Sequence, residues 1–191
     1  MHASLAPDDV DHTAFLTAVA AARANGHDVT ALDLRAEGFV PVMSAAEHSA
    51  YMTDEPIISD DVRRHAELVA QAEALVFVYP TTLSTLPALL KGWLERVLVM
   101  GVAFVLDERT RRVRPGLTHV RRIVGITTHP GSRPLLRRSP DNGRRIIRRA
   151  LRLNTGLRTR SAWVALRGRA TATPADRRRF LRRIERRMAR L

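Results

Sequence analysis

The chain has 191 residues, 45% of them hydrophobic, and this length and composition predict one globular domain spanning residues 1–191. It contains no cysteine, which excludes disulfides, thiolate metal sites and cysteine nucleophiles, and agrees with a reducing, cytoplasmic location. No apolar run approaches the roughly 18 residues of a membrane span, and the acidic N-terminal sequence does not resemble a signal peptide.

The net charge of +13 is unevenly distributed. Residues 1–105 hold six Lys and Arg against fourteen Asp and Glu, and residues 106–191 hold twenty-six against five, so the two parts carry −8 and +21. Such a field can attract a nicotinamide dinucleotide, nucleic acid or acidic lipid. Lys91 is the only lysine, however, which indicates codon bias toward arginine, and no zinc-finger spacing or aromatic-interleaved basic strand is present. We therefore expect no nucleic-acid partner.

The N-terminal part predicts alternating helices and strands. An alanine-rich helix is expected from about residue 11 to 25, because Gly26 follows as a typical C-terminal cap. Residues 27–32 alternate weakly and predict a strand, and a long polar connection follows from residue 33 to 56. Ser59 and the two aspartates after it then favour the start of a helix that runs to about residue 71.

The middle of the chain predicts a strand, a polar loop and a helix. Residues 75–79, LVFVY, are apolar and partly β-branched, as in a strand buried on both faces, and Pro80 ends it. Pro87 suits the first turn of a helix, because it has no N–H to satisfy there. Apolar residues recur behind it at helical spacing: Leu89, Leu90, Trp93, Leu94 and Val97. Ligands of an open α/β sheet bind just beyond the carboxyl end of such a strand.

The C-terminal part continues the alternation. We expect an exposed hairpin at 107–115, strands at 122–127 and 162–166, a loop at 129–140, a helix at 144–153 and a terminal helix beginning at Thr173-Pro174. The terminal helix combines many arginines with an apolar stripe, a pattern compatible with a membrane-surface helix. We expect the stripe to pack on the sheet instead, because α/β sheets need helices on both faces.

A family resemblance rests on three segments at fixed spacing. The principal segment is Pro80, followed by PALLKGWLERV at residues 87–97 and GVAF at residues 101–104. It resembles the flavodoxin-like NAD(P)H:quinone oxidoreductases of the DT-diaphorase type, and residues 33–44 and 126–132 resemble further segments of that family. The resemblance implies an α/β fold: a doubly wound parallel sheet in the order 2-1-3-4-5, with helices on both faces and the first strand mostly missing.

The N-terminus departs from the family pattern. Relatives open with an apolar strand and a His-Pro-x-Pro-x-Ser-Phe-like loop that wraps the flavin phosphate, whereas here only four residues precede Leu5, and Asp8, Asp9 and Asp11 would repel a phosphate. One hypothesis is that Met1 is a truncated or misassigned start, with about six to ten apolar residues upstream. The rival hypothesis is a degenerate relative with weak or no flavin binding that acts as a binding or regulatory subunit.

The resemblance also implies the site. The loop of Pro80, Thr81, Thr82, Leu83 and Ser84 would run along the flavin ring, with Thr82 and Leu83 where most relatives have aromatic residues. Thr127 and Thr128 would face the pyrimidine end of the flavin, and Gly131 belongs to the loop beyond them. His129 is the candidate catalytic residue, as a source of a proton or positive charge, although a loop histidine without partners is more often merely solvated.

The implied reaction is a two-electron, ping-pong hydride transfer. NAD(P)H would reduce bound FMN or FAD at N5, and a quinone or similar acceptor would then take two electrons at the same face. The resemblance implies a homodimer, with Lys91, Trp93 and Arg96 serving packing and the dimer interface. The seven histidines show no metal-ligand spacing, and Ser84 and Ser132 lack a nucleophile-elbow context, so we expect neither a metal site nor a hydrolase.

Overall fold

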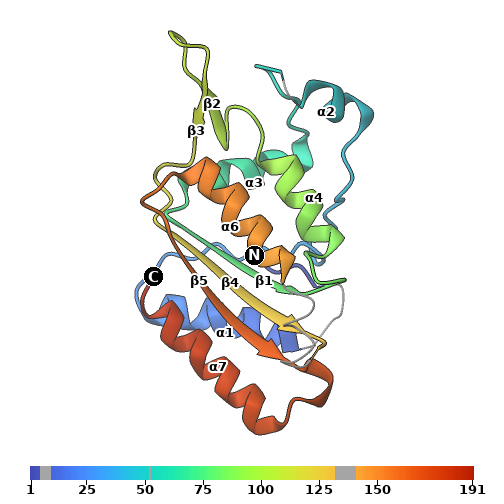
Figure 1. The fold of residues 1–191 in the computed structure, drawn as a ribbon, viewed down its shortest axis with the longest axis vertical. Coiled ribbons are helices and arrows are strands. Elements are labelled where there is room, and N and C mark those ends of the chain that lie inside the picture. Colours follow the sequence, from blue (N-terminus) through green and yellow to red (C-terminus); the bar gives the residue numbers. More distant parts are fainter. Residues whose placement is uncertain (5–9, 52, 132–140) are drawn as a thin grey trace.

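The computed structural model describes residues 1–4, 10–51, 53–131 and 141–191 (Figure 1). Its centre is a parallel three-stranded sheet in the order β1 (Ala74–Pro80), β4 (Arg122–His129) and β5 (Arg160–Arg167). The apolar sequences of β1 and β4 suit their position, because most of their residues are buried. The three predicted strands from residue 75 onward are therefore confirmed.

The first four residues extend this sheet beyond β1. His2 forms parallel bridges to Val78 of β1 on one side and to Asp33 on the other. The His2 N–H donates to the Leu32 carbonyl at 2.7 Å, and the Leu34 N–H donates to the His2 carbonyl at 3.1 Å. Residues 1–4 thus take the place of strand 1 in the expected order 2-1-3-4-5, second from one edge, with Asp33 at that edge and β5 at the other.

The prediction of a strand at residues 27–32 was wrong. These residues have no strand structure, and the only bridge of this segment is at Asp33. A strand needs a hydrogen-bonded neighbour along its length, and residues 1–4 reach only the level of Leu32 to Leu34. Polar and apolar residues do alternate weakly in this segment. Among the described residues, however, no neighbouring backbone runs along it to form the hydrogen bonds of a strand.

Helices cover both faces of the sheet, as Figure 1 shows. Helices α1 (Val10–Ala24) and α7 (Pro174–Met188) pack together on one face, and their core includes Phe15, Ile126 and Ile184. Helices α3 (Asp60–Gln71), α4 (Ala88–Val97) and α6 (Asn142–Thr155) lie on the other face, around a core that includes Phe77 and Trp93. The apolar stripe of α7 packs on the sheet, as predicted. Within the described residues, no helix is both long and apolar enough to cross a membrane.

Three smaller elements lie outside these layers. The expected hairpin is present, with β2 (Phe104–Leu106) antiparallel to β3 (Val113–Pro115), and the short helix η1 (Arg169–Thr171) follows β5. The predicted polar connection from residue 33 to 56 contains an unexpected helix, α2 (Ala45–Ala50). Ser44 and Glu47 form a capping box at its start, which was readable in the sequence as S-x-x-E.

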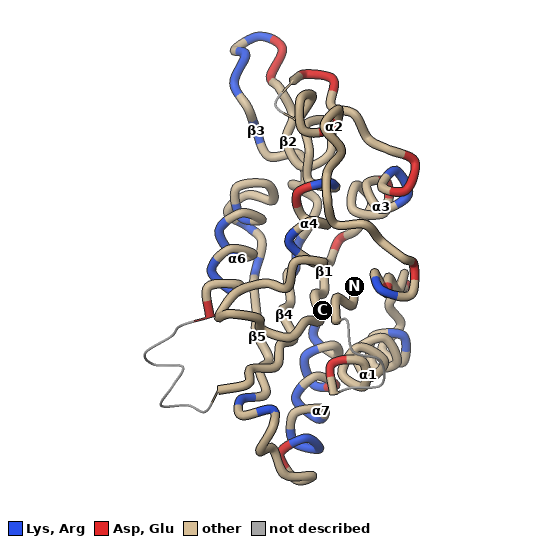
Figure 2. The backbone as a smooth tube through the Cα atoms, turned by 90° about the vertical axis from the view of Figure 1, so that its right-hand side faces the viewer, with Lys and Arg blue, Asp and Glu red and all other residues tan. Residues whose placement is uncertain are grey.

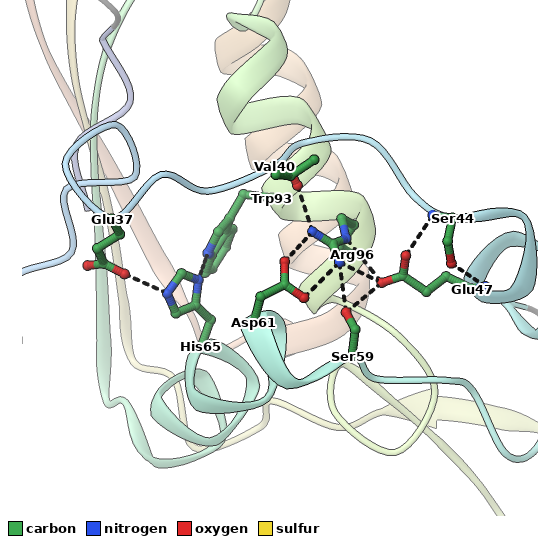
Figure 3. Close-up of polar contacts among 9 residues, drawn as sticks. All are labelled: Glu37, Val40, Ser44, Glu47, Ser59, Asp61, His65, Trp93 and Arg96. Atoms are coloured by element: carbon green, nitrogen blue, oxygen red, sulfur yellow. Dashed lines mark hydrogen bonds and ion pairs between the residues drawn. The ribbon is translucent and has the colours of Figure 1, made fainter.

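Arg96 of α4 holds this long connection against the domain (Figure 3). Its guanidinium is buried and binds Glu47 at 2.8 Å, Asp61 at 2.7 Å and the Val40 carbonyl at 2.6 Å. Burial opposes the charged form of Glu47, but hydrogen bonds from Ser44, Arg96 and Ser59 outweigh it and lower the pKa of the carboxyl from 4.5 to about 2. Arg96 therefore has a structural role.

Trp93 of α4 makes a second link to the connection (Figure 3). Its indole N–H donates to Nδ1 of buried His65 at 3.0 Å, and Nε2 of His65 lies 2.8 Å from Glu37. Because Nδ1 accepts, Nε2 carries the proton and donates to Glu37. Lys91, by contrast, pairs with Glu95 on the exposed side of α4. The packing role expected for Trp93 and Arg96 is thus visible within one chain.

The arginine-rich half of the chain presents its charge on the helices. Figure 2 shows Lys and Arg along α6 and α7, whereas Asp and Glu lie mainly on the other elements, including α2 and the start of α3, and the tip of the β2–β3 hairpin carries both signs. The buried residues of α7 are Phe180, Ile184 and Met188, so its arginines lie on the remaining faces of the helix. The positive charge of the C-terminal part is therefore concentrated on α6 and α7, while the hairpin carries both signs.

Candidate functional site

The carboxyl ends of β1 and β4 bring together most of the predicted site residues. Thr81 donates its N–H to the Thr128 carbonyl at 2.8 Å, and the hydroxyls of Thr81 and Thr127 lie 3.0 Å apart. Pro80 pairs with Thr128 in the β1–β4 register. Thr81, Thr127 and Thr128 are all buried, so these strand ends form a tightly hydrogen-bonded floor. Parallel strand ends of an α/β sheet are the usual place for a ligand.

The loop after β1 ends in a strained two-residue turn. Thr82 and Thr85 exchange backbone hydrogen bonds of 3.0 and 2.8 Å, and the two residues between them, Leu83 and Ser84, have φ values of 46° and 59°. Positive φ at both central positions is the geometry of a type I′ turn, and it is uncommon for residues other than glycine and asparagine. Leu83 is 94% exposed at the tip, so its side chain does not join the threonines at the strand ends.

His129 ends β4 and is buried beside Asp141. Its Nε2 lies 3.6 Å from the Asp141 carboxylate, and its Nδ1 is buried without a hydrogen-bond partner in the described part of the chain. Burial lowers the pKa of His129 below 6.5, the nearby Asp141 acts in the opposite direction, and Arg167 adds to the lowering. The imidazole is therefore neutral at neutral pH, and it is buried in this structure rather than solvated.

The loop between β4 and α6 is described only at its two ends. Gly131 is half-buried, and its carbonyl accepts the Gly168 N–H at 2.9 Å, which ties this loop to the end of β5. Asn142 at the other end donates its N–H to the Ser84 carbonyl at 2.8 Å. The predictions that involve Ser132 and the rest of the loop to Pro140 lie outside the described residues, as do Leu5 to Asp9.

Asp11, which the sequence marks only as a residue that would repel a phosphate, makes contacts at the site that the sequence did not reveal. It is the second residue of α1 and is buried, and the Thr128 hydroxyl lies 2.9 Å from both of its carboxylate oxygens. Nη1 of Arg169 lies 3.3 Å from the same carboxylate. An acidic residue in the first turn of a helix was readable as a favourable dipole contact, but its partner, 117 residues away, was not.

A flavin fits the ring end of this site better than the phosphate end. The strand ends are polar, and Nδ1 of His129 has no hydrogen-bond partner among the described residues, which suits a polar, planar ring. The N-terminal end of α1 would suit a phosphate, but there Asp11 already places a carboxylate against Thr128. The donor set therefore agrees with a flavin ring and disagrees with a dianion at α1.

A separate polar cluster lies near the start of the chain. Nδ1 of His2 is 3.1 Å and Nδ1 of His12 is 3.8 Å from the same carboxylate oxygen of Asp33. One potential ligand atom from each of these three residues lies within 4.8 Å of the others. The linear spacing of the histidines gave no sign of this grouping. The Asp33 carboxylate also accepts the backbone N–H groups of Arg35 and Ala36, so hydrogen bonding accounts for its position.

Comparisons with known proteins agree with this geometry. Residues 2–147 match the family described as having the flavodoxin-like fold. An uncharacterized NAD(P)H oxidoreductase of Haemophilus influenzae is 35% identical over 80 residues, which is 42% of this chain and 39% of that protein. The chain spans about two fifths of the length of the curated relatives it matches.

Two solved structures are similar over nearly the whole chain. An NAD(P)H:quinone oxidoreductase from Methanothermobacter marburgensis has a TM-score of 0.80 at 21% identity, covering 98% of this chain and 94% of that one. An FMN-dependent NADH-azoreductase from Bacillus anthracis, solved in complex with FMN, has a TM-score of 0.72 at 15% identity, covering 95% and 91%. At these identities the similarity demonstrates the shared fold.

Proposed function

Because the chain belongs to the family of proteins with the flavodoxin-like fold, we propose that it is a flavin-dependent NAD(P)H oxidoreductase that reduces a quinone. The observation that carries this proposal is the floor of buried threonines at the ends of β1 and β4, with His129 beside it. The names of the relatives support the same chemistry, since they include an NAD(P)H oxidoreductase and an NAD(P)H:quinone oxidoreductase.

The protein's part in this reaction is to bind and orient. A bound flavin supplies the ring that accepts and passes on two electrons. The backbone of the 80–84 loop and the Thr127 hydroxyl would hold the ring beside the strand ends. A neutral His129, with Nε2 toward Asp141, can accept a hydrogen bond at Nδ1 or hold a proton there. FMN is the first flavin to test, because the azoreductase from Bacillus anthracis is FMN-dependent, and FAD is the second.

Reconstitution tests the proposal directly. The purified protein is incubated with FMN or FAD, freed of excess flavin by gel filtration, and examined for visible flavin absorption. We expect retained colour, bleaching by NADPH or NADH without oxygen, and recovery when a quinone is added. Thr127→Val should weaken flavin retention, whereas Thr110→Val on the exposed hairpin should not. A protein that stays colourless with both flavins would contradict the proposal.

One observation favours a second candidate function. The Asp11 carboxylate at the start of α1 opposes a phosphate group, as expected of a relative with weak or no flavin binding that acts as a binding or regulatory subunit. The same titration separates the two candidates, because such a relative would bind neither flavin at micromolar concentration but would remain folded by circular dichroism.

We also propose a homodimer in the cytoplasm. Large apolar side chains are exposed on α6 and just beyond it, with Leu153 at 73% and Leu157 at 83% exposure, and a second copy of the chain could cover them. The absence of cysteine is compatible with a reducing compartment. Sedimentation equilibrium should give twice the monomer mass of 21.4 kDa, and Leu157→Glu should shift the equilibrium toward the monomer.

A further inference from the structure

The cluster of His2, His12 and Asp33 joins three separate segments of the chain. His2 lies on the extended segment that pairs with β1, His12 lies in the first turn of α1, and Asp33 follows residues 27–32 at the edge of the sheet. None of the three is among the residues expected to hold a flavin. Two imidazoles and one carboxylate are a common ligand set for transition metals in proteins.

The fold fixes the position of the first histidine. The His2 N–H donates to the Leu32 carbonyl at 2.7 Å, and the His2 carbonyl accepts the Leu34 N–H at 3.1 Å. Its imidazole is buried and stacks on the ring of Phe15, with the ring centres 5.2 Å apart and the planes inclined by 17°. The imidazole is therefore held in one orientation by backbone and side-chain contacts together.

The two carboxylate oxygens of Asp33 face different partners. Oδ1 accepts the backbone N–H groups of Arg35 and Ala36, both at 3.1 Å. Oδ2 faces the two histidines, with Nδ1 of His2 at 3.1 Å and Nδ1 of His12 at 3.8 Å. Hydrogen bonds to one oxygen orient the other, as outer hydrogen bonds commonly do for a carboxylate that binds a metal through a single oxygen.

The spacing of these atoms suits a cation between them. Ligand atoms of a tetrahedral zinc ion, bound at roughly 2.0–2.1 Å, lie about 3.3 Å from one another. The distances of 3.1 and 3.8 Å from Oδ2 of Asp33 to the two histidines lie on either side of this value. The longer distance exceeds that of a hydrogen bond, so direct bonding to Asp33 does not explain why His12 points at the same oxygen. A shift of about 0.5 Å in the side chain of His12 would complete the geometry.

We propose that His2, His12 and Asp33 bind one Zn²⁺ ion. Imidazole nitrogen favours zinc and its transition-metal neighbours over Mg²⁺ and Ca²⁺, which prefer oxygen ligands. The side chains of His12 and Asp33 are 30% and 19% exposed, so solvent can reach the cluster and supply water as a fourth ligand. The ion would tie the start of α1 to the edge of the sheet. This proposal does not depend on flavin binding.

Metal titration of the protein, produced without a histidine tag and freed of metal by a chelator, tests the proposal. We expect calorimetry to give one Zn²⁺ per chain with a dissociation constant of about 1 µM or lower. A Zn²⁺ concentration about a hundredfold above that constant should raise Tm by about 5 °C or more, whereas Mg²⁺ should not. Co²⁺ should give the visible absorption of a tetrahedral site, and Zn²⁺ should displace it.

His12→Ala should weaken Zn²⁺ binding by at least about a hundredfold, because it removes a ligand outright. His48→Ala, at an exposed position of α2, is the matched control and should leave the dissociation constant unchanged. Asp33→Asn provides a second variant that removes the charge and keeps the size of the side chain. The Tm of each variant without metal shows whether it is folded, so that lost binding is not confused with unfolding.

Two outcomes would overturn the proposal. One is that the unmodified protein binds Zn²⁺ no more tightly than about 100 µM. The other is Zn²⁺ binding that His12→Ala or Asp33→Asn leaves unchanged, which would place the ion elsewhere on the chain. A protein that binds Zn²⁺ as expected but neither flavin would contradict the proposed oxidoreductase function alone.

Discussion

If the proposed function is correct, Asp11 disfavours the phosphate end of the flavin relative to the ring end. Its carboxylate is buried at the N-terminal end of α1, where backbone N–H groups would otherwise be available to a phosphate. We predict that Asp11→Asn, which keeps the shape of the side chain and removes its charge, strengthens FMN binding about tenfold while riboflavin binding changes little. Fluorescence titration of both ligands measures the ratio of their dissociation constants.

The matched control is Asp60→Asn at the exposed start of α3, which should leave both constants unchanged. If Asp11→Asn alters FMN and riboflavin binding equally, Asp11 acts on the ring end through Thr128 and not on the phosphate. If neither flavin binds the unmodified protein or the variant, the proposed function itself fails.

Glu47 makes the stability of the fold depend on pH. Its folded pKa of about 2 lies below its ordinary value of 4.5, so its contribution is fully present above pH 4.5 and is lost as the pH falls toward 2. The shift corresponds to roughly 3 kcal/mol in the free energy of unfolding. We predict that Glu47→Gln lowers this free energy at pH 7 by a similar amount and flattens its dependence on pH between 4.5 and 2, as urea unfolding would measure.

Glu95→Gln is the control for that experiment. Glu95 pairs with Lys91 on the exposed side of α4, and such pairs contribute at most about 1 kcal/mol. A Glu47 variant that keeps the full pH dependence of the unmodified protein would show that other carboxylates, Asp61 first among them, cause the acid lability.

At the scale of elements, β4 and β5 are matched through Gly125 and Trp163. The two residues pair in the register, and a Cβ atom at Gly125 would lie 2.1 Å from the indole ring of Trp163. Arg144 of α6 stacks over the same ring, 5.5 Å from the ring centre. An added methyl group at Gly125 would therefore have to displace the Trp163 ring and the Arg144 side chain over it.

We predict that Gly125→Ala destabilises the protein by about 1–3 kcal/mol, the usual cost of overpacking. Trp163→Leu removes the obstructing ring, so Gly125→Ala should cost much less in that background. A double-mutant cycle by thermal or urea unfolding measures the coupling. Additive effects of the two substitutions would mean that the alanine is accommodated without contact with the ring.

Elements with strong local signals were predictable from the sequence, and those that depend on partners were not. The apolar run of β1 and the proline at the start of α4 are signals within the elements themselves, and both elements form as expected. The strand predicted at residues 27–32 depended on a neighbouring strand, and it does not form. The convergence of Thr81 with Thr127 followed from parallel strand ends, but contacts such as Asp11 with Thr128 and His129 with Asp141 arise only when distant segments pack.

At the scale of the whole molecule, the positive charge is spread over a large part of the surface and does not form one binding site for an anion. Residues 106–191 carry a charge of +21, and Figure 2 shows many of their arginines spread along α6 and α7. No single arginine is thereby singled out as a ligand for phosphate. A distributed positive field acts mainly on the rate at which an anion arrives, and salt screens it over about 8–10 Å at physiological ionic strength.

If the proposed activity is correct, this field should act on the dinucleotide and not on the quinone. NADPH carries several negative charges and a simple quinone carries none, so we predict that kcat/KM for NADPH falls about tenfold as KCl rises from roughly 0.05 to 0.5 M. The value for the quinone should change less than about twofold over the same range. Steady-state kinetics with each substrate varied in turn provides both numbers on one protein. If kcat/KM for the two substrates depends equally on salt, salt alters the enzyme itself. If kcat/KM is unchanged for both, the arginines of α6 and α7 do not steer the dinucleotide.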